Sequence, residues 1–192
     1  KGDFIEIDYV GRLHENNKIF DLTSQKLAQQ EGIYNPKAPY GPRIICVGEA
    51  QVVKGLDDSF IGKNVSSYAL NLHPEEAFGK KNPQLIKIVS ASMFKNQQVK
   101  PFPGLQLDMD GLIGTVRAVS GGRVVIDFNH PLAGRDVLYE ITIKRIVTDI
   151  KEKISSVLAP LFGAATPAFT YQNNILTISS PVQQPLHEPI SL

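Results

Sequence analysis

Strict alternation of apolar and polar residues, repeated in separate segments, limits this chain to a fold built on antiparallel β-sheet. Ile5, Ile7 and Tyr9 alternate with charged residues, and the same period of two returns at 68–72 and 139–143. Successive side chains of a strand point to opposite faces, so each segment predicts a strand with one buried face. Further strands are expected at 44–47, 85–89, 114–119 and 124–128, with a last pair within 167–179. Because helix signals are few, we expect a β-dominated α+β chain.

Helix signals are short and occur in three places. Leu56 and Phe60 lie four residues apart, which puts them on one face of a short helix that Gly62 ends. A polar stretch at 25–31 follows side chains suited to capping a helix. Apolar residues recur at helical spacing over 150–162, which predicts another helix near the end of the chain.

Charge is unevenly distributed along the 192 residues. Lys and Arg total 20 and Asp and Glu total 19, a near balance that argues against a dedicated nucleic-acid binder. Residues 80–128 hold seven basic and three acidic side chains, whereas residues 1–79 hold eight and eleven. A basic segment inside a neutral to acidic chain indicates a separate module with its own partner.

The cysteine and histidine content argues against disulfides and metal sites. Cys46 is the single cysteine, so it forms no intramolecular disulfide, and the four histidines are too scattered for a zinc cluster. No apolar run approaches the roughly 18–20 residues of a membrane helix. The sequence therefore predicts a cytoplasmic protein with no membrane contact, no metal and no cofactor.

No common catalytic signature is complete in this chain. The glycines of 55–63 are wrongly spaced for a phosphate loop, and Ser92 and Lys95 lack the partner motifs of an acylating serine. An enzyme without a nucleophile, metal or cofactor motif needs a reaction that breaks no stable bond. Prolyl cis/trans isomerisation is such a reaction. Its barrier of about 18–20 kcal/mol comes from amide resonance. A dry aromatic pocket lowers it by removing the water that stabilises the charge-separated resonance form.

Five motifs occur in an order typical of one family. They are 8–13 (DYVGRL), 19–24 (IFDLTS), 51–56 (QVVKGL), 74–79 (PEEAFG) and 138–143 (LYEITI). Together they resemble the motifs of the FKBP-type peptidyl-prolyl isomerases. Residues 128–136 (FNHPLAGRD) are similar to the segment where the insert-in-flap domain of SlyD-like members rejoins the catalytic barrel. The extra C-terminal segment resembles the long archaeal members.

The resemblance implies a division of the chain into three parts. Residues 1–79 and 129–150 are expected to form the FKBP-like antiparallel half-barrel around a short helix. Residues 80–128 are expected to be a small β-rich domain inserted in the flap. Residues 151–192 are expected to be a C-terminal extension of one helix and two short strands, either a dimerisation element or a domain cut short.

The resemblance also implies the site residues. Eight residues match positions that line the family's proline pocket: Tyr9, Phe20, Asp21, Val52, Val53, Leu56, Phe78 and Tyr139. A ninth, Leu132, is expected to line it from the flap side. A backbone N–H near Val53 is expected to donate to a substrate carbonyl. Phe78 stands where the family usually has Tyr, so a hydroxyl that binds substrate is missing. A lost hydrogen bond is worth about 0.5–1.5 kcal/mol, and we expect activity to fall by about 2- to 12-fold.

Each of these residues also has a plainer interpretation. Tyr9 and Leu56 taken singly are typical core residues, and Asp21 taken singly is typical of a helix N-cap. In the insert, Ile88, Met93 and Phe94 are candidate client-binding residues, and the alternative is that they form the insert's own small core.

Two functional hypotheses follow from the resemblance. The first is a prolyl isomerase that accelerates protein folding and has chaperone activity in the insert. The second is a holdase or docking module whose isomerase pocket has decayed. The implied partners are unfolded polypeptides and X-Pro peptides, together with the ribosome for the basic insert and macrolide inhibitors of the FKBP family.

Overall fold

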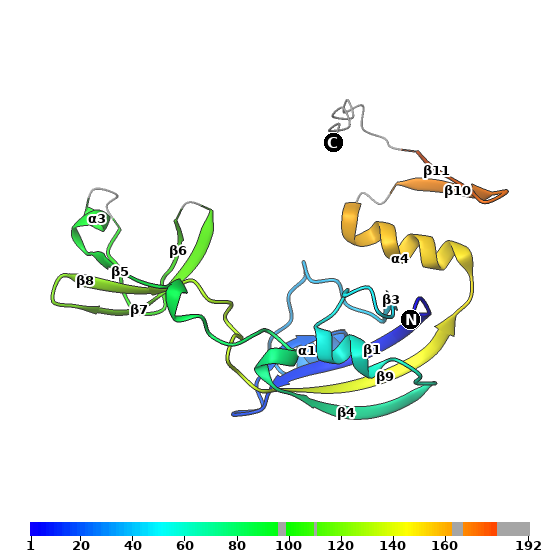
Figure 1. Cartoon of the computed structure of the whole chain (residues 1–192), viewed down its shortest axis with the longest axis horizontal. Helices are drawn as coiled ribbons and strands as arrows, with labels where there is room; N and C mark the ends of the chain where they lie inside the picture. The colour runs from blue at the N-terminus through cyan, green and yellow to red at the C-terminus, as the bar shows by residue number, and fades with distance from the viewer. Residues whose placement is uncertain (96–98, 110, 163–166, 180–192) are drawn as a thin grey trace.

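The computed structural model of the chain describes residues 1–95, 99–109, 111–162 and 167–179. Antiparallel strands dominate them (Figure 1). The strands are β1 (Phe4–Leu13), β2 (Ile19–Leu22), β3 (Arg43–Cys46), β4 (Ser66–Leu72), β5 (Ile86–Ser90), β6 (Gln106–Met109), β7 (Leu112–Ser120), β8 (Arg123–Asp127), β9 (Val137–Val147), β10 (Ala168–Gln172) and β11 (Ile175–Ser179). The helices are α1 (Gln25–Gln30), α2 (Lys54–Ser59), α3 (Ser92–Lys95) and α4 (Ile150–Phe162), with 3₁₀ turns η1 (Pro74–Glu76) and η2 (Pro83–Leu85).

The large sheet forms the main core against the short helix α2. Its strand order is β2-β1-β9-β4, and β3 pairs with β1 beside β2. Every second residue of β1 is buried, as the alternation predicts. Leu56 of α2 and Phe60, its C-cap, belong to the same buried cluster as residues of β1 and β9. The expected half-barrel around a short helix, and with it the α+β fold class, is confirmed.

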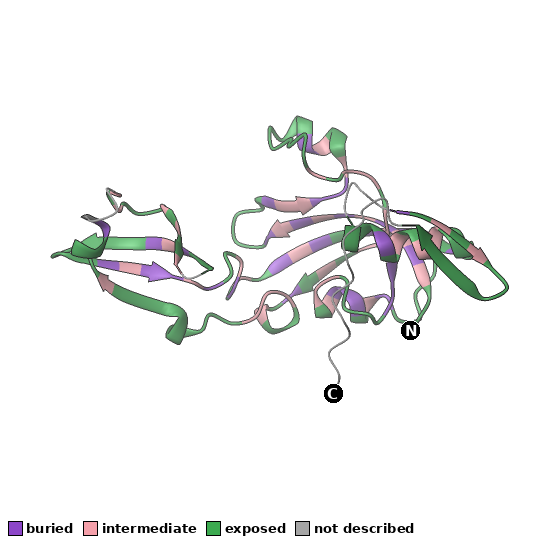
Figure 2. Cartoon of the chain, turned by 90° about the horizontal axis from the view of Figure 1, so that it is seen from above, coloured by how far each residue is buried: buried purple, intermediate pink, exposed green. Residues whose placement is uncertain are grey.

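A second, four-stranded sheet with the order β5-β8-β7-β6 forms a lobe apart from the large sheet (Figure 2). β7 and β8 make the expected hairpin, and positive φ angles at Gly121 and Gly122 fit a type I′ turn. β6 and α3 were not predicted, because four residues carry too little periodicity to reveal an element. The buried residues of this lobe are Phe94, Val116, Val124 and Ile126.

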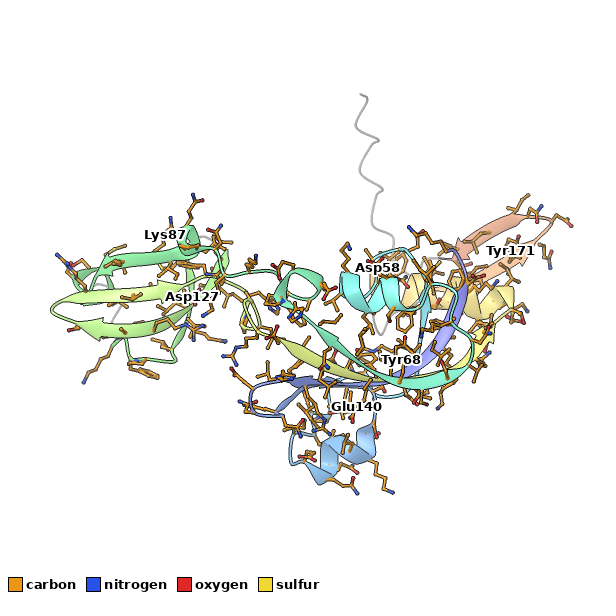
Figure 3. The ribbon with its side chains drawn as sticks, turned by 60° about the horizontal axis from the view of Figure 1, so that its bottom comes forward. Asp58, Tyr68, Lys87, Asp127, Glu140 and Tyr171 are labelled. Carbon is orange, nitrogen blue, oxygen red and sulfur yellow. The ribbon has the colours of Figure 1, made fainter. Side chains whose placement is uncertain are left out.

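Polar side chains at the base of this lobe hold its two connections together. Asn129 Oδ1 accepts from the backbone N–H of Asn82 at 2.8 Å, and Asn129 Nδ2 donates to the Asn82 carbonyl at 3.1 Å. Asp127 accepts from the backbone and side-chain N–H groups of Asn129 at 2.9 and 2.8 Å, and from Arg117 Nε at 3.1 Å. We call Asn82, Arg117, Asp127 and Asn129 the neck; Figure 3 labels Asp127.

α4 covers the helix expected over 150–162, and β10 and β11 are the pair of strands expected within 167–179. α4 lies against β3, and Arg145 of β9 donates to Glu152 of α4 at 2.8 and 2.9 Å. β10 and β11 form a hairpin with positive φ at Asn173 and Asn174. The proline-rich end of the expected extension, residues 180–192, lies outside the described residues. Among the helices that the structure describes, none has the length and apolarity needed to cross a membrane.

Candidate active site

Four aromatic rings from distant parts of the chain meet on the buried face of the large sheet. The ring centroids of Tyr9 and Tyr139 lie 5.9 Å apart, those of Tyr139 and Phe20 lie 5.7 Å apart, and those of Phe20 and Phe78 lie 5.7 Å apart. The pairs are edge-on, an arrangement favoured by the ring quadrupoles. β1, β2, β9 and the segment after η1 each supply one ring. We call these four residues the aromatic site.

The residues that line this site divide into a buried floor and a half-buried rim. Tyr9, Tyr139 and Leu56 are buried in the main core. Five other expected residues are half-buried and pack against the same cluster: Phe20, Val52, Val53, Phe78 and Leu132. The structure therefore brings these eight residues to one apolar surface that remains partly open to solvent.

Asp21, the remaining expected residue, is the polar group at this surface. The Tyr9 hydroxyl donates to Asp21 Oδ2 at 2.8 Å. Burial, together with the Asp21 charge, raises the pKa of Tyr9 above its usual value, so its hydroxyl stays protonated and remains a donor. Asp21 is not the helix cap that it resembles in isolation, because Ser24 Oγ accepts the Leu27 N–H and caps α1.

Gly11 makes room for the rings, a role that the sequence analysis did not assign. A Cβ at Gly11 would lie 2.7 Å from Phe20 Cζ and 3.0 Å from Tyr139 Cε1. Any side chain at this position therefore displaces a ring of the aromatic site. A glycine inside a strand is the sequence signal of such a close approach, and it was present in the DYVGRL motif.

Val53 presents a backbone donor at the start of α2. Its extended backbone caps the helix, and its carbonyl accepts from the N–H groups of Leu56 and Asp57 at 3.0 Å. Within the described residues, no hydrogen bond uses the Val53 N–H. The buried Asp57 carboxylate accepts from the Gly48 and Ala50 N–H groups at 2.8 and 3.0 Å and so fixes the preceding loop. The Val53 N–H is thus held in place and available to a ligand.

His130 extends the aromatic site at its rim. Its ring stacks on Phe78 with centroids 4.8 Å apart and an interplanar angle of 2°. His130 Nδ1 accepts the Leu132 N–H at 3.2 Å, which assigns the proton of the neutral ring to Nε2. The sequence analysis did not include His130, because a histidine before proline in a loop gives no sign of which ring it contacts.

The candidate client-binding residues of the inserted lobe lie in two environments. Ile88 and Met93 are 66% and 52% exposed. Phe94 is 4% exposed and belongs to the lobe's core, so its expected place on a client-binding surface is corrected. Other large apolar side chains are exposed in this lobe, namely Ile86, Phe102, Leu112 and Ile113.

A shallow groove of about 460 Å³ lies on the outer face of the large sheet and includes Tyr9 in its lining. Asp8, Glu140 and Thr142 line it, and Figure 3 shows Glu140 on the side of the sheet away from Asp58 of α2. Among the described residues, no group of three His, Cys, Asp or Glu side chains is arranged to hold a metal ion. The apolar surface around the aromatic site remains the candidate active site.

The chain is similar to several known proteins. It is 32% identical over 139 residues to the FKBP-type 16 kDa peptidyl-prolyl cis-trans isomerase of Escherichia coli K12, a match that covers 70% of this chain and 88% of the relative. It is 27% identical over 147 residues to the short-type peptidyl-prolyl cis-trans isomerase of Methanocaldococcus jannaschii, covering 76% and 92%.

One family model matches the inserted lobe, and a third relative matches a larger part of the chain. A family model described as FKBP26, IF domain, matches residues 87–132, close to the span of the four-stranded sheet. The peptidyl-prolyl cis-trans isomerase SlyD of Pasteurella multocida is 28% identical over 120 residues, which covers 59% of this chain and 60% of the relative.

Proposed function

Because this chain belongs to the FKBP-type peptidyl-prolyl cis-trans isomerases, we propose that its aromatic site binds the proline of an X-Pro segment and accelerates cis/trans isomerisation. The observation that carries the proposal is the convergence of four rings over a buried floor with an open rim. Such a surface accepts a prolyl ring and excludes the water around its imide bond.

The site acts on the barrier without covalent chemistry. Water stabilises the charge-separated form of the imide, so its removal favours the twisted, less conjugated transition state. Only interactions that are stronger in that twisted state raise the rate. A 10⁴-fold acceleration needs about 5–6 kcal/mol, which aromatic contacts and a small number of hydrogen bonds supply.

The polar groups at the rim orient the substrate. The Val53 N–H is the donor that we assign to a substrate carbonyl. Asp21 accepts the Tyr9 hydroxyl and so fixes the orientation of that ring. Phe78 supplies an apolar wall and no hydroxyl, so substrate binding at this wall depends on contact with the ring alone.

The inserted lobe is the part that we assign to the binding of unfolded chains. Ile88 and Met93 expose apolar surface, and a flexible Met suits varied partners. Seven basic and three acidic side chains in 80–128 favour clients that carry acidic residues. We propose that the lobe captures exposed apolar segments in the cytoplasm and presents their prolines to the aromatic site.

The test is the cis-to-trans rate of a proline tetrapeptide, compared with the refolding rate of a proline-limited protein. The hydrogen bonds between Asn82 and Asn129 hold the ends of the lobe together, so a short linker can replace residues 83–128. The deletion should leave the tetrapeptide rate nearly unchanged and lower the refolding rate. Equal losses of rate on the tetrapeptide and on the refolding protein would refute the proposal that the lobe binds unfolded chains while the aromatic site isomerises prolines.

Variants at the aromatic site distinguish an isomerase from a holdase with a decayed pocket. Wild-type activity that rises about 2- to 12-fold in Phe78→Tyr and falls in Asp21→Ala supports the isomerase. Competition by a macrolide FKBP inhibitor gives an independent measure of the same site. An inactive wild type that still suppresses aggregation would instead support the holdase.

The basic charge of the lobe favours one further partner, the ribosome. Contacts with phosphates release counterions, so their affinity falls steeply with salt. We expect co-sedimentation with ribosomes at low salt and its loss as salt rises. Association that is indifferent to salt would argue against a nucleic-acid contact.

A further inference from the structure

Arg43 is a half-buried cation at the aromatic site whose charge has no partner there. It begins β3, and its place in the strand register is opposite Ile7 of β1. Residues paired across antiparallel strands project to the same face, so Arg43 shares the core face with Ile7 and Tyr9. Its guanidinium carbon lies 5.7 Å from the centre of the Tyr9 ring.

No ion pair holds the Arg43 guanidinium in its place beside Tyr9 among the described residues. In the part of the chain that the structure describes, Arg43 makes no side-chain hydrogen bond and has no carboxylate within 4.0 Å. Asp21, the carboxylate of the site, accepts the Tyr9 hydroxyl instead. The contact with the Tyr9 face holds the cation by a cation–π interaction and leaves the N–H donors of the guanidinium free.

We propose that Arg43 is a specificity-determining residue that selects X-Pro segments with an acidic residue beside the proline. A guanidinium binds a carboxylate through two parallel N–H···O bonds, which a lysine ammonium cannot reproduce. Because Arg43 touches the ring that forms the floor of the site, a carboxylate one residue from a bound proline is its fitting partner. This inference rests on the proposed isomerase function and adds to it a substrate class.

The test compares blocked tetrapeptides that differ by one charge. Acetylated, amidated Ala-Xaa-Pro-Phe is used with Glu, Gln or Lys as Xaa, and a second pair has Glu or Gln after the proline. We expect wild type to prefer Glu over Gln at one of these positions by about fivefold in kcat/KM, the upper end for a solvent-accessible ion pair. The preference should appear mainly in KM and shrink in 0.5 M salt.

Two substitutions at Arg43 test the role of its charge, and a third substitution elsewhere in the chain is the control. In Arg43→Gln the preference for Glu should disappear, whereas Arg43→Lys should keep part of it. Lys26→Gln removes one positive charge from the exposed side of α1, outside the aromatic site and the lobe, and should leave the preference intact. An equal Glu preference in wild type and Arg43→Gln, or no preference in wild type, would overturn the proposal.

Binding gives a readout that does not depend on turnover. An NMR titration with the same peptides reports Kd even for an inactive protein. Tighter binding of the Glu peptide by wild type, lost in Arg43→Gln, supports the role of Arg43 whether or not the peptide is isomerised. An isomerase that binds and turns over Glu and Gln peptides equally refutes the role of Arg43 and leaves the proposed function standing.

Discussion

Replacing Asp127 with Asn removes the charge at the centre of the neck while it keeps the size of the side chain. Asp127 is 3% exposed, and its two oxygens receive hydrogen bonds from Asn129 and from the Arg117 guanidinium. The hydrogen bonds from Asn129 and Arg117 outweigh burial and hold the pKa of Asp127 below its usual value. An amide at this position turns an NH₂ group toward one of these donors.

The magnitude follows from the bonds that are lost. A hydrogen bond to a charged group is worth about 1.5–3 kcal/mol, and Arg117 recovers part of this because it is half exposed and water reaches it. We therefore expect Asp127→Asn to lower the unfolding free energy of the inserted lobe by about 2–3 kcal/mol at neutral pH. The measurement is urea unfolding combined with hydrogen exchange of the β7 and β8 amides.

The pH dependence gives a second check. The folded-state pKa of Asp127 is lowered, so its contribution is present above the unfolded value and is lost as pH falls through the folded value. The difference in unfolding free energy between wild type and Asp127→Asn should be constant above about pH 5 and should become smaller below about pH 4. The control is Asp108→Asn, at an exposed carboxylate of the same lobe that accepts the Gly111 N–H at 2.9 Å. A gap below about 0.5 kcal/mol at pH 7, or one that persists in acid, would refute the reasoning.

Three further predictions concern the barrel. Gly11→Val should lower tetrapeptide kcat/KM at least about tenfold, because its side chain displaces Phe20; an unchanged rate would contradict the close packing. His130→Ala should lower kcat/KM by about 2- to 12-fold through loss of the stack on Phe78, and His130→Phe should restore it. The hydrogen bond to Asp136 raises the pKa of His73 in the folded protein. The stabilisation of the fold by this pair is therefore full below about pH 6.5, and it is lost as pH rises through the folded-state pKa of His73. His73→Gln should therefore lower Tm at pH 5.5 and not at pH 9, and equal losses at both would disprove the assignment.

The elements that the sequence predicted well are those with strong local patterns. The alternation over Ile5, Ile7 and Tyr9 determined the buried face of β1, and the paired glycines at 121 and 122 determined a hairpin turn. β6 was missed because its apolar and polar residues alternate over four positions only. Short elements owe their structure to neighbouring strands, and a single sequence does not display those neighbours.

The candidate site was predictable where motifs carried it and unpredictable where only contacts did. The nine expected residues came from the order of the motifs, and the structure places them around one apolar surface. Phe94 was misplaced because an apolar residue looks the same in sequence whether it packs inward or outward. His130 and Arg43 were missed because their contacts with Phe78 and Tyr9 depend on tertiary placement.

The hydrogen bonds between Asn82 and Asn129 also make the stability of the large sheet largely independent of the stability of the lobe. Because these bonds join Asn82 to Asn129, residues 83–128 act as one closed loop attached to the half-barrel. The entropic cost of closing a loop grows only slowly with its length. Unfolding of the lobe therefore lowers the free energy of unfolding of the half-barrel only slightly. The two parts of the chain can change in stability independently under selection. The sequence and stability of the lobe can therefore change without disturbing the four rings of the aromatic site.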